Sequence, residues 1–446
     1  MRTLVLIAGL VACSTAPPAA PDAVEIDAAT DGDATVAPSY GERCGNAIDD
    51  DGDGLADEDC TPRLFAGVYA PAVAADPALA AIESATLRPL AVLQTYHSLS
   101  AQGIARTAPD LAAIFARGQV AHLNVEPSGY TLAQYAAPTS APLAADLAAM
   151  AEAIAGALAA APHGRVLLTF GAEMNGSWTD WGCLPAAQYI ALYRAFHDRV
   201  RDALVAGVID PRRVRWAYGP NATSSASCGS SAGYYPGHAY VDLLGMSAYR
   251  SGTDSVAMTV IAPMAQLFGA LAYPAVWQRD RFVVLQTGTR AVPGDDRDAW
   301  ITGLVHALTA DTRVAGLVYF DAADWGVPPN GAGWAGLVTS LGDAPIADRA
   351  LDATFLPHFW DVAYGDPGFA EIQALRDAGV TSGCATAPAR FCPDDMLDTD
   401  AAQALLARAF PDGAPSAVVA ALAAPMTRAQ AAILIARGAG LAPRGL

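Results

Sequence analysis

Apolar residues from residue 64 onward form short runs that alternate with longer segments rich in alanine and leucine. The short runs carry the β-branched and aromatic residues typical of buried strands, and the longer segments have amphipathic helical spacing. Eight strands are expected, over residues 64–69, 90–96, 119–125, 165–170, 214–218, 241–247, 282–286 and 316–320. Helices are expected between them, for example over 144–159, 186–206 and 298–310. Eight such repeats predict an α/β fold, a (β/α)8 TIM barrel. An open, doubly wound sheet is the rival fold, but no glycine-rich dinucleotide-binding motif follows any strand.

The composition of the chain changes along its length and divides it into five segments. The barrel occupies residues 63–353, and a small, mainly helical domain follows at 354–446. Three short segments precede the barrel: a signal peptide (1–13), a flexible acidic linker (14–41) and an Asp-rich loop that forms a stalk (42–62). The linker has almost no large apolar side chain, so it cannot bury enough surface to fold.

The first residues predict export. Arg2 precedes an apolar run over 4–11, which is typical of a signal peptide and too short to span a membrane. Residues 10–13, Leu-Val-Ala-Cys, resemble the lipobox of bacterial lipoproteins. The resemblance implies that Cys13 is acylated and that the protein is lipid-anchored in the cell envelope, at the outer membrane or cell surface. The alternative is an ordinary signal peptide with an incidental cysteine.

Acidic residues alternate in the stalk, at Asp49, Asp51 and Asp53, and are followed by Asp57 and Glu58. These hard oxygen ligands are the ones Ca²⁺ prefers, so a structural calcium site is expected there. The segment resembles the Asp-rich, Cys-flanked metal-binding motif of myxobacterial surface proteins and the calcium loops of thrombospondin type 3 repeats. The alternative is a solvated acidic loop closed by one disulfide.

The chain has seven cysteines, and six remain if Cys13 carries lipid. They fall into three pairs that are close in sequence or in the predicted fold, although six cysteines allow 15 connectivities. The expected pairs are Cys44 with Cys60, Cys183 with Cys228, and Cys384 with Cys392. An oxidising compartment favours such bridges.

The charge balance excludes one class of partner. Asp and Glu number 45 against 26 basic residues, which gives a formal net charge of −19. A nucleic-acid partner needs clustered cations that displace counterions from phosphates, and no basic stripe occurs. No two histidines of the chain have the i, i+4 spacing with which a helix binds zinc, so a zinc hydrolase is poorly supported. There is no Gly-X-Ser-X-Gly motif, so a serine esterase is poorly supported too.

Polar and aromatic residues cluster where the predicted strands end, which is where such barrels carry their chemistry. The motifs are residues 173–178, 216–221, 234–237, 240–242 and 318–321, together with Tyr249. In this order they resemble glycoside hydrolase family 26, the family of endo-β-mannanases and related β-glycanases. The resemblance spans about residues 63–345 and implies a retaining hydrolase of β-linked polysaccharide, with Glu173 as the catalytic acid.

Gln286 falls at the position where the family has its nucleophilic glutamate. A neutral amide cannot form a glycosyl ester, so the two-carboxylate mechanism lacks one of its groups. Ala172 also replaces the histidine that usually precedes the acid. Glu126 or Asp321, at the ends of strands three and eight, could instead activate a water in an inverting mechanism. The alternatives are that Glu126 shapes its loop before Pro127 and that Asp321 caps a helix or pairs with an arginine.

The strand-end loops also supply residues suited to bind a sugar. Aromatic rings can stack on the apolar face of a pyranose, and polar side chains can bond its hydroxyls. The expected substrate-binding residues are Asn175, Trp178, Trp181, Asn221, Tyr249, Asp321 and Trp325. One or two of these are expected to be ordinary packing residues.

The C-terminal segment contains one pattern over residues 369–409, with apolar positions at Phe369, Ile372 and Leu375, and a second, partial copy over 425–432, Pro-Met-Thr-Arg-Ala-Gln-Ala-Ala. It resembles S-layer homology repeats, which implies binding of a cell-wall or envelope polymer; the alternative is a small helical interaction domain. For the whole protein, two functions remain open. One is a hydrolase that uses Glu173 with an unconventional partner, and the other is a non-catalytic glycan-binding pseudoenzyme on the cell surface.

Overall fold

The computed structural model describes residues 64–73, 76–87, 89–342, 358–362, 366–386 and 389–441. The signal peptide with Cys13, the linker and the Asp-rich loop with the Cys44 and Cys60 pair lie outside these residues. The expected boundary between barrel and C-terminal domain, at 353/354, also lies outside them. Those expectations therefore stay predictions.

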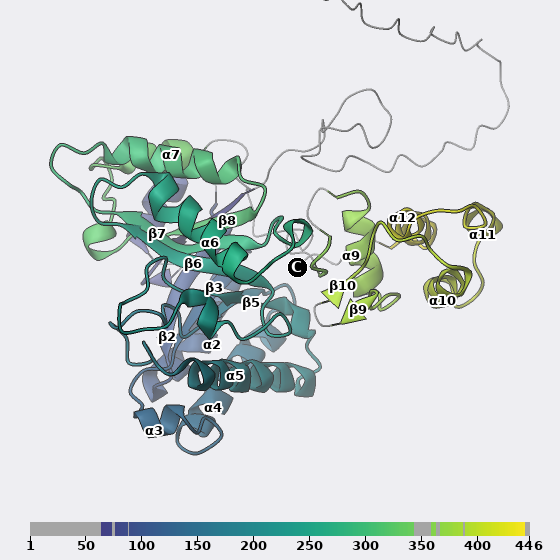
Figure 1. The fold of residues 1–446 in the computed structure, drawn as a ribbon, viewed down its shortest axis with the longest axis horizontal. Helices are drawn as coiled ribbons and strands as arrows, with labels where there is room; N and C mark the ends of the chain where they lie inside the picture. The colour runs from purple at the N-terminus through teal and green to yellow at the C-terminus, as the bar shows by residue number, and fades with distance from the viewer. Residues whose placement is uncertain are drawn as a thin grey trace, which may run out of the picture. The chain divides into compact units, whose positions relative to one another are not determined.

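Eight parallel strands close into a barrel (Figure 1). Each strand pairs with its neighbours in sequence, and β1 pairs with β8 to complete the ring. The strands are β1 (Phe65–Tyr69), β2 (Val92–Ser98), β3 (Val120–Glu126), β4 (Val166–Phe170), β5 (Val214–Tyr218), β6 (Leu243–Arg250), β7 (Phe282–Thr289) and β8 (Val314–Tyr319). The predicted (β/α)8 fold is confirmed.

Two strands run further than the sequence pattern indicates. β6 ends at Arg250 and β7 ends at Thr289, each three residues past the expected ends at 247 and 286. The two strands pair through Arg250 and Thr289, beyond a shift in register between Met246 and Ser247. Gln286 is therefore held inside a paired strand, which fixes its backbone.

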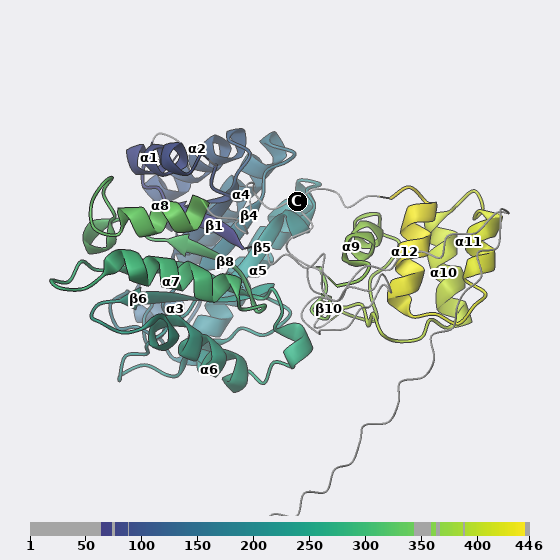
Figure 2. The same cartoon turned by 90° about the horizontal axis from the view of Figure 1, so that it is seen from above.

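Helices surround the strands, as Figure 2 shows for α1, α2, α7 and α8. Their bounds are α1 (Pro77–Thr86), α2 (Ala101–Ala116), α3 (Leu132–Tyr135), α4 (Leu143–Ala160), α5 (Ala186–Ala206), α6 (Ala262–Ala270), α7 (Arg297–Thr309) and α8 (Trp334–Gly342). Helix α4 is long and apolar enough to cross a membrane by length and composition. Its Leu147, Ile154 and Leu158 are buried in the main hydrophobic core, so it packs as a core helix.

The side chains inside the barrel change character along its axis. Near the start of the strands they form an apolar plug that includes Phe65, Val92, Val120, Leu167 and Val283. Gly316 belongs to this layer because a Cβ there would lie 2.4 Å from the ring of Phe65. Alternate residues of a strand share one face, so the same face of β2 and β3 continues upward from this plug.

A buried polar layer lies on the same faces of β2, β3 and β4. The amide nitrogen of Gln94 lies 3.1 Å from Nδ1 of His122, and Nε2 of His122 lies 3.0 Å from the Thr169 hydroxyl. Because an amide nitrogen only donates, Nδ1 is the acceptor and the proton is on Nε2. Burial lowers the pKa of His122 to about 3, so this imidazole is neutral. The layer tethers three strands directly below their carboxyl ends.

The C-terminal residues form helices around their own apolar core, which includes Phe359, Ile372, Phe391 and Ile435. The elements are α9 (Phe369–Asp377), β9 (Ala385–Thr386), β10 (Ala389–Arg390), α10 (Thr399–Ala409), α11 (Ser416–Ala421) and α12 (Arg428–Gly438). The predicted Cys384–Cys392 disulfide is present. Thr427 caps α12, and Gln430 accepts from the Thr427 N–H at 2.9 Å, so glutamine closes a capping box as glutamate would.

Candidate functional site

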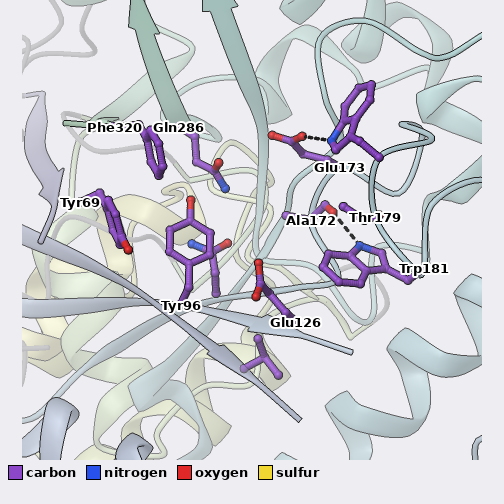
Figure 3. A pocket seen from close by; sticks show the side chains of 12 residues that line it. Tyr69, Tyr96, Glu126, Ala172, Glu173, Thr179, Trp181, Gln286 and Phe320 are labelled. Atoms are coloured by element: carbon purple, nitrogen blue, oxygen red, sulfur yellow. Dashed lines mark hydrogen bonds between the residues drawn. The ribbon is translucent and has the colours of Figure 1, made fainter. Parts of the chain in front are cut away.

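A cavity of about 410 Å³ lies where the strands end (Figure 3). The residues that line it come from β1, β2, β3 and β7, from the loop after β4, and from the residue after β8. They are Tyr69, Tyr96, Asn124, Val125, Glu126, Ala172, Glu173, Trp178, Thr179, Trp181, Gln286 and Phe320. None of these described lining residues is basic, so the carboxyl groups of Glu126 and Glu173 have no cation beside them in the cavity wall.

Glu173 is held by a tight turn three residues after the end of β4. Gly171 and Glu173 both have positive φ, 55° and 59°, and the Glu173 N–H donates to the Gly219 carbonyl at 2.8 Å. A positive φ is unfavourable for glutamate, and such residues concentrate at functional sites. The indole N–H of Trp178 donates to Oε2 of Glu173 at 2.6 Å. The carboxyl group is thereby fixed toward the cavity.

Burial raises the pKa of Glu173, and hydrogen bonds from the Ser247, Trp178 and Asn221 side chains lower it in part. A raised carboxyl pKa keeps a proton available for donation at higher pH, as a general acid requires. Gly176 makes this arrangement possible, because a Cβ at that position would lie 2.2 Å from the Trp178 ring.

Gln286 faces the same cavity from β7 and is 5% exposed. The Tyr249 hydroxyl donates to its Oε1 at 2.9 Å. The amide nitrogen is then the part of Gln286 that can donate to a ligand. The residue is neutral, so it offers a hydrogen bond where a nucleophile would offer a negative charge.

Glu126 is the last residue of β3 and also lines the cavity. Burial raises the pKa of its carboxyl group, and the nearby charge of Glu173 raises it further. No described residue donates a hydrogen bond to this carboxylate. Glu126 therefore differs from Glu173, whose carboxylate is already bonded to Trp178.

Aromatic rings form two sides of the cavity (Figure 3). On one side, Tyr69 stacks on Phe320 with centroids 4.9 Å apart and planes 7° apart, and Tyr96 meets Tyr69 edge-on at 5.1 Å. Trp181 lies on the other side; it is 5% exposed, and its indole N–H donates to the Ala172 carbonyl. Trp178, at 55% exposed, leaves a large ring open to a ligand.

The structure places Asn175 beneath the loops; Asn221 does not line the cavity either, but its side chain hydrogen-bonds the Glu173 carboxyl group. Asn175 is fully buried; its amide nitrogen donates to the Asn221 carbonyl at 2.8 Å, and its Oδ1 accepts from the Asn221 N–H at 2.8 Å. The predicted Cys183–Cys228 disulfide is present and joins the same two loops. These residues hold the loop that carries Glu173.

Three other predicted binding residues lie behind the cavity wall. Tyr249 contacts Gln286, and its ring packs against Trp325 with centroids 4.7 Å apart. The guanidinium carbon of Arg290 also lies 4.7 Å from the centroid of the Trp325 ring. Asp321 accepts a hydrogen bond from the Val327 N–H at 2.5 Å and does not line the cavity, so it fixes its own loop.

The expected set of site residues omits several that line the cavity, namely Tyr69, Tyr96, Asn124, Thr179 and Phe320. The sequence carried a signal for four of them, because Tyr69, Tyr96, Asn124 and Phe320 lie at or near strand ends. On β3 the alternate residues His122, Asn124 and Glu126 are polar, which is unusual for the inward face of a barrel strand. That pattern places polar chemistry on β3.

One group of possible metal ligands occurs among the described residues, formed by Asp361, Cys384 and Cys392. The two cysteines are bonded to each other, and the Asp361 carboxylate accepts from the N–H groups of Phe391 and Cys392 at 2.7 Å each. These three residues therefore have a structural role in the C-terminal domain. The predicted calcium ligands, Asp49 to Glu58, lie outside the described residues.

The fold and cavity define a barrel protein with a carboxyl- and aromatic-lined site, and part of the chain is similar to a known family. The model of glycosyl hydrolase family 26 matches residues 134–279. This segment includes β4, Glu173, Trp178 and Trp181, so the barrel contains a family 26-type segment. Glu126 and Gln286 lie outside the matched residues.

The chain is also similar to individual known proteins, and the match to the relative found by sequence covers a small part of that protein. A mannan endo-1,4-beta-mannosidase of Bifidobacterium adolescentis is 36% identical over 81 residues, which are 18% of this chain and 8% of that protein. Among solved structures, Bacillus subtilis mannanase man26 is 18% identical with a TM-score of 0.48, over 65% of this chain and 88% of that one. A modular endo-beta-1,4-mannanase of Cellulomonas fimi is 20% identical with a TM-score of 0.49, over 64% of this chain and 72% of that one.

Proposed function

We propose that this chain binds β-linked polysaccharide of the β-mannan class in the cavity at the end of its barrel, with Glu173 as proton donor. The observation that carries the proposal is the Glu173 carboxyl group. It is buried, has a raised pKa, is held by the Trp178 indole and faces a cavity with aromatic sides. The family 26 match to residues 134–279 supports the substrate class, as does the name of the B. adolescentis relative.

A second candidate function is a non-catalytic glycan-binding protein. The amide of Gln286 favours it, because no carboxylate from β7 can attack the anomeric carbon or balance its positive charge in the transition state. Both candidates use the same aromatic surfaces, so binding alone does not separate them.

Reducing-end release from a panel of soluble mannans and xylans, run beside a binding assay on the same polymers, tests both candidates. Hydrolysis of a mannan that Glu173→Gln abolishes while binding persists supports the enzyme. Binding without release supports the glycan-binding protein. If no β-linked polymer binds and none is cleaved, the proposed function is wrong.

Three further proposals concern the segments on either side of the barrel. We propose that the protein is exported and anchored in the cell envelope through lipid on Cys13. Incorporation of radiolabelled fatty acid, lost in Cys13→Ala, would test this.

We propose that Asp49, Asp51, Asp53, Asp57 and Glu58 bind one structural Ca²⁺. Calorimetry of the full chain with CaCl2, compared with the triple variant Asp49→Asn, Asp51→Asn and Asp53→Asn, would test the second.

The third proposal concerns the C-terminal repeats, which we propose bind an envelope polymer. The capping box of Thr427 and Gln430 supports this, because it preserves the helix start on which the S-layer homology resemblance rests. Co-sedimentation of the full chain with purified cell walls, compared with the variant Arg428→Ala, would test it.

A further inference from the structure

The wall of the cavity formed by β2 and β3 has hydrogen-bonding groups without partners. Asn124 is 1% exposed, and neither its amide nitrogen nor its amide oxygen has a partner among the described residues. The buried hydroxyl of Tyr96 has none either. An unpaired buried polar atom costs about 1–3 kcal/mol. Two such residues in one wall indicate a site built to meet a polar ligand.

Glu126 stands at the top of this wall. It lies two residues after Asn124 on β3, so the two side chains share the strand face that points into the barrel. Figure 3 shows the Glu126 carboxylate directed into the cavity that Glu173 and Gln286 also face. No described residue bonds the Glu126 carboxylate, and no hydrogen bond between described residues joins it to Glu173. The carboxylate is free to accept a hydrogen bond from water or from a sugar hydroxyl.

We propose that Glu126 is the general base of an inverting glycoside hydrolysis in this cavity, with Glu173 as the general acid and Asn124 as a positioning residue. This inference rests on the proposed binding of β-linked polysaccharide. It differs from a retaining mechanism because it requires no nucleophile on β7, where Gln286 stands. It instead requires two carboxyl groups separated by room for a water molecule, about 6.5–9.5 Å in inverting enzymes.

The step balances in atoms and charge. A water oxygen attacks the anomeric carbon while the bond from that carbon to the leaving oxygen breaks. Glu126 takes one proton from the water, and Glu173 gives its proton to the leaving oxygen. The products are a hemiacetal whose anomeric configuration is inverted and a shortened glycan with a free hydroxyl. The two carboxyl groups have exchanged their protonation states, and proton transfer through solvent restores them.

The electrostatics of the cavity suit one proton shared by two carboxyl groups. Burial raises the pKa of both groups, and the charge of Glu173 raises that of Glu126. With no basic residue in the described lining, ionising both carboxyls at once is unfavourable. The two carboxyl groups therefore share one proton, and the assignment of that proton to Glu173 rests on the proposed function rather than on these shifts.

Other groups serve this role less well. Asp321 was an equal candidate from the sequence, but its carboxylate is bonded to the Val327 N–H and does not line the cavity. Gln286 cannot take a proton at any ordinary pH. The bond from Tyr249 uses the amide oxygen of Gln286, so the amide nitrogen can donate to a sugar hydroxyl or to the attacking water.

The test uses the full chain with β-1,4-linked mannohexaose. Proton NMR of the first product formed by the wild type should show the α anomer, the inverted product of a β-linked substrate. Glu126→Gln should lower turnover at least about 100-fold, the scale of general acid–base catalysis. Its binding of mannohexaose, measured by calorimetry, should stay within a few-fold of the wild type. The matched control Glu152→Gln, an exposed position on α4, should leave turnover unchanged.

The outcomes separate the two proposals. Release of the β anomer first, turnover that survives in a folded Glu126→Gln, or a wild type that binds mannohexaose without cleaving it would each overturn the role of Glu126. The last of these would leave the binding proposal standing. The product anomer is read on the wild type, so this test does not depend on whether a variant folds. Failure to bind or cleave any β-linked glycan would instead overturn the proposed function.

Discussion

The ends of β3 and β7 face the same cavity with opposite chemistry. On β7, three residues before the strand ends, Gln286 is neutral and its oxygen is already bonded to Tyr249. At the end of β3, Glu126 can carry a charge, and the Asn124 amide below it has no partner. The buried cavity-lining groups without a partner, those of Tyr96 and Asn124, therefore lie on β2 and β3 rather than on β7. Under the proposal above, the unpaired polar groups that face the cavity indicate where the reacting charge lies, and the position of a residue in a family pattern does not.

Glu173 is the proton donor whether the second catalytic group lies on β3 or on β7. Its removal should therefore have the largest effect on turnover. Glu173→Gln removes the proton donor and keeps the size of the side chain and its contact with Trp178. Turnover on mannan should fall about 100- to 10,000-fold, and binding should remain. Reducing-end assays with calorimetry on the same samples measure both. Turnover within tenfold of the wild type would remove Glu173 from the chemistry.

Gln286→Glu would place a carboxylate on β7 opposite the one on β3. Tyr249 can still donate to the new side chain, so the wall should keep its geometry. A nucleophile on this strand would favour retention, with carboxyl groups about 5–5.5 Å apart. We expect β-anomer product to become measurable, with partial efficiency because Ala172 still lacks the neighbouring histidine of the family. Product anomers followed by NMR measure this change; if the α anomer remains the sole product, β7 has no access to the anomeric carbon.

Trp178→Phe tests how the Glu173 carboxyl group is tuned. The variant keeps an aromatic ring but loses the N–H that donates to the carboxylate. Because that hydrogen bond stabilises the charged form, its loss should raise the pKa of Glu173 further. Activity needs protonated Glu173 and falls as pH rises through its pKa, so the basic limb of the pH–rate profile should move to higher pH. If the basic limb stays in place or moves to lower pH, the ionisation of Glu173 is not its cause.

Glu126→Gln, which should lower activity, should raise the thermal stability of the protein by a small amount. Burial raises the folded-state pKa of Glu126 above its unfolded value, so the folded state holds its proton more tightly. Stability from this group is complete below the ordinary carboxyl pKa and is lost as pH rises through the raised folded value. Glutamine avoids that loss, so the variant should melt a few degrees above the wild type at pH 7 and close to it at pH 3.5. Melting curves at both pH values measure this; a variant that melts lower at pH 7 would show that Glu126 stabilises the fold in its charged form.

The sequence predicted the barrel well and the site less evenly. Strong alternation of short apolar runs and amphipathic segments located all eight strands, and β5 matched at both ends. Glu173, Gln286, Trp178 and Trp181 were expected at the cavity and line it. Asn175 and Asp321 could not be assigned from sequence, because only the loop geometry shows that their side chains are taken up by Asn221 and Val327.

The residues that the prediction missed have a common physical cause. Tyr69 and Phe320 lie side by side because β1 pairs with β8 when the barrel closes, although some 250 residues of sequence separate them. No local pattern reports that contact. Asn124 could have been found, because a polar residue between His122 and Glu126 on the inward face of a strand departs from the apolar filling expected there.

The most direct test of the account is calorimetric titration of the full-length chain with β-1,4-linked mannohexaose, in the Glu173→Gln background so that the ligand is not consumed. We expect saturable binding that weakens at least about tenfold when Tyr69→Ala and Phe320→Ala remove the stacked pair, since the apolar area that the rings bury against the sugar is lost, at about 25 cal/mol per Å². An α-linked glucan should give no heat. Equal binding with and without the two rings, or no binding of mannohexaose at all, would contradict the claim that this cavity is a β-glycan site.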